Sequence, residues 1–176
     1  MAERSFQNSE IITVSEALDI AEDLTGGFYK FSLGQWQRHR YDIRTLPSLS
    51  SHEITPRGFA LLSKCSRVRD GFQWKTREED FYFICLQDHH ILRALTRDKR
   101  LELLPLLVYI FTHELVHIVR FCNFLQRYEV SGEKRVEEET IVHSITFDIL
   151  KRLSMPELNY VLDSYQGHRV CDMAVQ

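Results

Sequence analysis

The sequence predicts a mostly helical α+β domain with a small β-hairpin, and three observations lead to this class. Apolar residues recur at helical spacing over long segments of the second half of the chain. Short runs near its middle are rich in the aromatic and β-branched residues that favour strands. The chain has 176 residues and no repeat, low-complexity tract or linker, which indicates one core. We therefore predict a single domain over residues 1–176, with a frayed tail at about residues 168–176.

Two helices are predicted in the first part of the chain. The first begins at a capping-box pattern, TVSE at residues 13–16, and ends at the glycine pair 26–27. Residues 28–51 are aromatic and basic and show no clear period. A Thr-Pro pair then opens a short helix over residues 55–64.

The hairpin is predicted from strand formers at residues 73–75 and 81–86, which flank a polar segment. An Asp-His-His run follows at residues 88–90. Adjacent histidines on a helix diverge by about 100° and cannot both face one ion, so we interpret this run as surface or cap residues. Further on, a second capping box, SMPE at residues 154–157, opens a helix that extends to Tyr165 and ends at Gly167.

The overall composition excludes several classes of protein. The net charge is −3 and no basic cluster with interleaved aromatics occurs, which argues against nucleic-acid binding. The first residues lack the basic start and apolar core of a secretory signal, and the longest apolar stretch, residues 103–111, is too short to span a bilayer. The four cysteines form no C-x-x-C pair, which is typical of reduced thiols. We expect a cytoplasmic protein with no membrane or nucleic-acid partner.

The most informative segment is the apolar run 101–125, which contains His113, Glu114 and His117 as an H-E-x-x-H motif. Apolar residues on nearly every face predict a helix that is buried all round. The two histidines are four residues apart, so their imidazoles leave the same face of that helix. Burying two imidazoles and a carboxylate without partners is costly. The motif therefore favours a bound metal ion over the alternative, in which His113 and His117 are core histidines that are each hydrogen-bonded to a carbonyl or a carboxylate.

A second long helix is predicted over residues 133–153, after a turn-like stretch at 128–132. Its first turns carry Glu137, Glu138 and Glu139. Helices joined by a short connection pack side by side, so one of these carboxylates can reach the motif histidines. Zinc in catalytic sites usually takes three protein ligands and one water, and such a glutamate would be the third ligand.

HELVH followed by a glutamate on the next helix resembles the zincin metallopeptidases, and within them the gluzincin type. The resemblance covers residues 112–153 and implies a zincin-like core in which two central helices carry the metal site. It also implies that Glu114 is the general base of peptide hydrolysis. In that group the ligand glutamate often opens an E-x-x-x-D stretch whose aspartate orients a zinc-bound histidine. Here Glu139 has this spacing, and His143 stands in place of the aspartate.

Two neighbours, Glu138 and Glu139, compete for the role of third ligand. The spacing just described favours Glu139. The apolar stripe of the predicted helix favours Glu138, which falls nearest the centre of that stripe. The stripe consists of Ile141, Val142, Ile145, Ile149 and Leu153. We rank Glu139 slightly ahead, because a ligand with an orienting histidine beside it explains the presence of His143.

Together these residues predict a zinc-dependent hydrolase of the peptidase type, which acts on a peptide or protein substrate. One Zn²⁺ per chain, held by His113, His117 and Glu139 or Glu138, would lower the pKa of its water from about 15.7 toward about 7. Glu114 would accept the proton of that water. Candidate donors to the oxyanion are His143, Tyr128, Tyr160 and His168. Iron or nickel would also suit these ligands. The alternative is a zincin-like domain that binds metal for structure, regulation or partner recognition and cleaves nothing.

Overall fold

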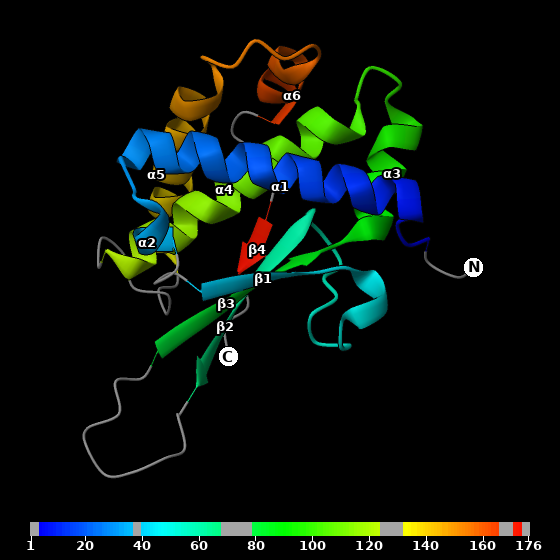
Figure 1. Ribbon diagram of the computed structural model, residues 1–176. Helices are drawn as coiled ribbons and strands as arrows, with labels where there is room; N and C mark the ends of the chain where they lie inside the picture. The colour runs from blue at the N-terminus through cyan, green and yellow to red at the C-terminus, as the bar shows by residue number, and fades with distance from the viewer. Residues whose placement is uncertain (1–3, 37–39, 68–78, 124–131, 166–170, 174–176) are drawn as a thin grey trace.

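The computed structural model describes residues 4–36, 40–67, 79–123, 132–165 and 171–173, and they form a mostly helical α+β fold (Figure 1). The helices are α1 (Asn8–Tyr29), α2 (Leu33–Trp36), α3 (Asp88–Arg97), α4 (Leu103–Cys122), α5 (Glu133–Leu150) and α6 (Leu158–Tyr165), with a 3-10 turn η1 (Leu46–Ser48). The strands are β1 (Arg40–Arg44), β2 (Ala60–Arg67), β3 (Glu79–Leu86) and β4 (Cys171–Met173).

The four strands form one mixed sheet in the order β1-β3-β2-β4. β2 and β3 are antiparallel, whereas β1 runs parallel to β3 and β4 runs parallel to β2. Alternate residues of β3 point toward the helices, and Tyr82 of this strand stacks on Phe121 of α4 with ring centroids 5.9 Å apart. The sheet thus covers one side of α4.

Helix α4 is the centre of the hydrophobic core, and every residue from Pro105 to Val119 is buried. α1 packs along it (Figure 1), with Ala17 and Ala21 fully buried. α4 as a whole is long and apolar enough to cross a membrane, unlike the shorter stretch 103–111 considered above. However, 83% of its most apolar window is buried inside the protein. The apolar side chains of α4 therefore form part of the hydrophobic core. Burial of each large apolar side chain contributes about 1.5–3 kcal/mol to the stability of the fold.

The start and the end predicted for the first helix are wrong. α1 begins at Asn8, where the Gln7 N–H donates to the Glu10 carboxylate over 2.7 Å. The hydroxyl of Thr13 instead donates back to the carbonyl of Ser9 within the helix. Nor does the glycine pair end the helix. A Cβ on Gly26 would lie 2.7 Å from Nε1 of Trp36, so this glycine permits close packing of the indole.

The helix predicted over residues 55–64 is also wrong, because residues 60–67 form β2. This strand pairs with β3, with Leu62 opposite Ile84, and both side chains are buried. The predicted strand 81–86 is confirmed as part of β3, but its hairpin partner is β2. Residues 73–75 lie outside the described residues. The strand β1 was missed within the segment 28–51, although Tyr41 and Ile43 alternate there with polar residues.

The surface assignment of residues 88–90 is wrong for Asp88 and His89, which are buried in the first turn of α3, whereas His90 is half-buried. The Asp88 carboxylate accepts the N–H of Phe6 over 3.0 Å and that of Leu46 over 3.1 Å. Burial raises its pKa, and these hydrogen bonds oppose that rise. Asp88 therefore joins three segments that are far apart in the sequence.

The last part of the chain differs from prediction at three points. α5 starts at Glu133 as predicted but ends at Leu150. α6 begins at Leu158, and Glu157 has a φ of +61°, so residues 154–157 do not form a helical capping box. The tail is not frayed throughout, because β4 pairs with β2, with Leu62 opposite Met173.

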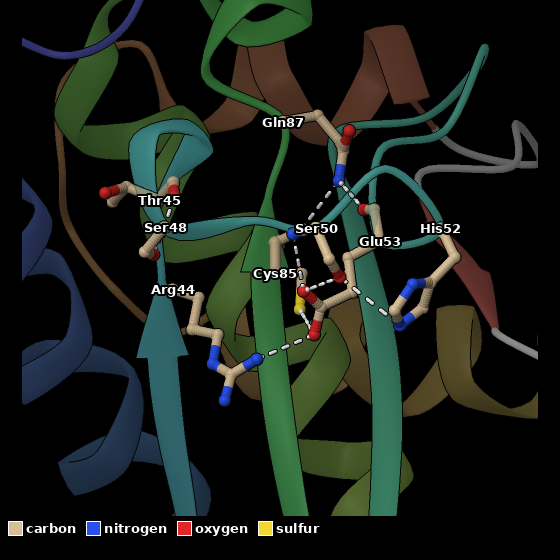
Figure 2. A network of polar contacts seen from close by, with 8 residues as sticks. All are labelled: Arg44, Thr45, Ser48, Ser50, His52, Glu53, Cys85 and Gln87. Carbon is tan, nitrogen blue, oxygen red and sulfur yellow. Dashed lines mark hydrogen bonds and ion pairs between the residues drawn. The ribbon is translucent and has the colours of Figure 1, made fainter.

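A buried polar network holds the loop between β1 and β2 (Figure 2). Its centre is Glu53, which is 5% exposed and accepts hydrogen bonds from Arg44 over 2.8 Å and from the Ser50 N–H over 2.8 Å. The side chain of Gln87 donates to the Glu53 carbonyl over 2.9 Å and accepts the N–H of Thr55 over 3.0 Å. Burial alone would raise the pKa of Glu53, but the hydrogen bonds from Ser50 and the charge of Arg44 lower it below its usual value.

Candidate metal centre

Three side chains of the predicted metal site come together where α4 and α5 pack against each other. His113 and His117 of α4 are fully buried, and Glu139 of α5 is 9% exposed. Nε2 of His113 lies 3.3 Å from Oε2 of Glu139, and Nε2 of His117 lies 3.2 Å from Oε1 of the same carboxylate. Each carboxylate oxygen thus faces one imidazole nitrogen.

Unpartnered ring nitrogens beside a carboxylate are the donors that a metal ion could use. Within the described part of the chain, all four ring nitrogens of His113 and His117 are buried without a hydrogen-bond partner. An ion in the plane of each ring, along the lone pair of Nε2, would give these nitrogens a partner. Zinc binds imidazole nitrogen at about 2.0–2.1 Å and carboxylate oxygen at a similar distance, so two ligands at a tetrahedral angle lie about 3.3 Å apart. The separations from Glu139 to His113 and to His117 match that value. Among the described residues, however, the group whose donor atoms all lie within 4.8 Å of one another is His113, Glu139 and His143, without His117.

The pKa shifts of His113 and Glu139 suit metal ligands, whereas the shift of His117 favours a protonated imidazole paired with Glu139. Burial lowers the pKa of His113 to about 4, so its imidazole is neutral at pH 7. Burial also acts to lower the pKa of His117, but the Glu139 carboxylate beside it outweighs this and raises the pKa. Burial acts to raise the pKa of Glu139, whereas the two histidines hold it far below its usual value. The carboxylate is therefore ionised, as a metal ligand must be.

His143 lies next to these residues on α5. Its ring centroid is 4.6 Å from that of His113, and its Nδ1 is 3.0 Å from the hydroxyl of Tyr109. Donor atoms of His113, Glu139 and His143 all lie within 4.8 Å of one another, so these three could also hold an ion. A hydrogen bond to one ring nitrogen is the usual way in which a metal-binding imidazole is oriented. The structure thus places His143 where it can act as a ligand as well as a neighbour of Glu139.

Glu138 points to another partner. Both oxygens of its carboxylate bind the guanidinium of Arg120, with a distance of 2.8 Å for the Nη2–Oε2 pair. Arg120 lies almost one turn beyond His117 on α4, so Glu138 and Glu139 face different parts of the same helix. Glu138 is buried, as the apolar periodicity predicted, whereas Ile141 of the predicted stripe is 36% exposed. Glu138 and Glu139 are therefore similar in burial. They differ in their partners, because Glu138 binds Arg120 and Glu139 faces the histidines.

Glu114 is fully buried on α4 next to the histidine pair. Its charge is close enough to raise the pKa of both His117 and the Cys85 thiol of β3. Glu114 thus follows His113 directly on α4 within reach of β3, while Glu139 approaches the histidines from α5. This position is compatible with a base beside the metal rather than a ligand to it.

Of the remaining candidates, Tyr160 lies away from the histidines, and its hydroxyl contacts Asp98 and Arg100. Tyr128 and His168 lie outside the described residues. Tyr109 was not anticipated, although it precedes His113 by four residues and so shares its helical face. Its hydroxyl also lies 3.5 Å from the carbonyl oxygen of Tyr165, which connects the site to the end of α6.

Comparison of the chain with protein-family models, with curated proteins and with solved structures gives no match. The chemistry of the site must therefore be argued from its own residues.

Proposed function

We infer that the protein is a zinc-dependent metallohydrolase of the peptidase type, built on a zincin-like core of α4, α5 and the sheet. This proposal rests on one observation: His113 and His117 lie within 3.3 Å of the Glu139 carboxylate, and Glu114 is buried next to His113 on α4. This combination supplies three ligands and a separate base, which is the division of roles that a hydrolytic zinc site needs.

Each residue has a distinct part in the proposed reaction. His113, His117 and Glu139 would hold the ion, which when bound would supply Lewis acidity to a water molecule and to the scissile carbonyl of a peptide. Glu114 accepts the proton of the attacking water on its carboxylate and passes it to the leaving amine. Among the described residues, His143, held by Tyr109, is a donor beside the ligands for the negative charge that develops on the carbonyl oxygen.

Burial limits how a substrate reaches the site. His113, Glu114 and His117 are fully buried, Glu139 is 9% exposed and His143 is half-buried. In the part of the chain that the structure describes, the cluster thus reaches solvent on its α5 side. A peptide would enter from that side, and hydrolysis requires the site to open there.

A non-catalytic metal-binding domain is the second candidate, and the position of His143 favours it. If His143 joins His113, His117 and Glu139, the ion has four protein ligands and no place for water, which is typical of structural zinc sites. The two candidates therefore differ in the ligand count at the metal.

Elemental analysis and peptide cleavage together test the proposed function. Purified without chelator, the wild type is expected to carry one zinc or similar ion per chain and to cut some members of a diverse peptide library. Glu114→Gln keeps the metal and loses cleavage, because only the proton acceptor is removed. Glu137→Gln, an exposed neighbour on α5 with the same charge change, serves as the matched control.

Zinc-edge X-ray absorption of the loaded wild type separates the two candidates. Three protein ligands and a water support the hydrolase, and four protein ligands support the binding domain. A wild type that carries no metal and takes up none on addition of zinc contradicts both.

A further inference from the structure

A cavity of about 300 Å³ lies between the β1–β2 loop, α3 and the end of α6. The loop contributes Gly58 and Phe59, α3 contributes its outer face, and α6 contributes Tyr165. Gly58 has a φ of +87°, a backbone conformation that favours glycine, so the chain turns sharply at the wall of the cavity. The polar network around Glu53 and Gln87 fixes the start of this loop (Figure 2).

Basic side chains line the α3 side of the cavity. His90, Arg93 and Arg97 follow one another at helical spacing, so they share one face of α3. Nε2 of His90 lies 3.0 Å from the carbonyl oxygen of Thr55, which can only accept, so His90 donates there and anchors the loop. Among the described residues, neither Arg93 nor Arg97 has a carboxylate within ion-pair distance. Two guanidinium groups with free donors thus face a cavity in a chain whose net charge is −3.

The β1–β2 loop and α6 contribute aromatic side chains to the cavity. The rings of Phe59 and Tyr165 meet edge to face with centroids 5.3 Å apart. Arg97 is close enough to Tyr165 for its charge to act on the phenol. A ligand in this cavity would therefore contact both the apolar ring surface and the positive charge.

We propose that this cavity, lined by Phe59 and Tyr165 and by Arg93 and Arg97, binds a small anion: a carboxylate or phosphate carried on an aromatic or apolar body. Guanidinium groups pair with both kinds of anion through two parallel hydrogen bonds. The cavity has a volume suited to a ligand of roughly one aromatic amino acid, near the lower end of typical small-molecule sites. The site is separate from the metal ligands and needs no metal.

Binding to the full chain is measured by isothermal titration calorimetry with three probes that share a ring: N-acetylphenylalanine, phenyl phosphate and N-acetylphenylalaninamide. At least one of the two anions binds about tenfold more tightly than the neutral amide, and the tighter of the two identifies carboxylate or phosphate as the natural group. Equal binding of the amide and both anions, or no binding of either anion, overturns the proposal.

The double variant Arg93→Gln/Arg97→Gln lowers the affinity for the preferred anion to that for the amide. Arg152→Gln, an exposed arginine outside the cavity, makes a single charge change and leaves the affinity unchanged. Both arginines of the double variant are exposed, so the fold is retained, and circular dichroism checks this. Unchanged affinity in the folded double variant contradicts the site.

The same titration in Glu114→Gln, and in wild type treated with chelator, gives wild-type affinity. If the proposed hydrolase function is wrong, the anion-binding result is therefore unaffected. If the anion site is wrong, the proposed hydrolase function is likewise unaffected.

Discussion

Exchange of Glu138 and Glu139 for glutamine, one at a time, separates two roles that the sequence places side by side. Glu138→Gln removes one charge of an ion pair whose side chains are only 13% and 7% exposed. Breaking a buried ion pair costs about 3–5 kcal/mol, and because glutamine keeps one acceptor for Arg120 we expect about 2–3 kcal/mol. Glu139→Gln removes the charge of the proposed third ligand, and the zinc affinity of this variant should fall more than about 100-fold, beyond the loss usual for residues that only orient a ligand.

Two measurements on each variant distinguish the effect on stability from the effect on zinc affinity. Urea unfolding of the metal-free protein should show a midpoint lower by about 1 M for Glu138→Gln, given a slope of about 1–3 kcal/mol per molar urea. Competition with a chelator should show near-wild-type zinc affinity for that variant and weak binding for Glu139→Gln. Glu137→Gln is expected to change neither quantity, because its side chain is exposed. The reverse ranking of the two zinc affinities would refute the ligand assignment.

Three further predictions concern groups outside the metal centre. Burial raises the pKa of the Cys85 thiol to about 12, so a thiol reagent at pH 8 should label exposed Cys65 rapidly in the native protein and Cys85 only after unfolding, as mapped by mass spectrometry. The lowered pKa of Glu53 stabilises the fold above the usual carboxyl range and loses this effect as the pH falls. The stability difference between wild type and Glu53→Gln should therefore shrink between about pH 5 and pH 3 in urea titrations, and a constant difference would contradict it. Asp88→Ala leaves the buried N–H of Phe6 and the half-buried N–H of Leu46 without an acceptor and should cost about 2–4 kcal/mol, whereas a loss below about 0.5 kcal/mol would contradict that role.

The helices of the candidate metal centre could be predicted because both carry strong local signals. The run around His113 is apolar on every face, and Glu133 follows a turn, so α4 and the start of α5 were placed within a few residues. The choice between Glu138 and Glu139 could not be made in this way. Both are buried, and their difference depends on where Arg120 and the histidines of another helix lie.

The strands were harder to predict because their partners are distant. β2 begins four residues after Pro56, and a Thr-Pro pair suits a helix start equally well. What decides the outcome is pairing with β3, which a local pattern does not contain. Gly26 is a similar case. Its local sequence suggests the end of a helix, and only the contact with Trp36 shows why a glycine occurs there.

The central place of α4 has a consequence for the order in which the newly made chain can fold. α1 leaves the ribosome early, yet the helix on which it packs is complete only at Cys122, about 90 residues and roughly 5–20 s of synthesis later. Likewise, β1 cannot pair until β3 has been synthesised, and the N–H of Phe6 has no acceptor until Asp88 has been synthesised. The first third of the chain therefore emerges with its apolar side chains uncovered, a state in which chaperone binding or aggregation competes with folding.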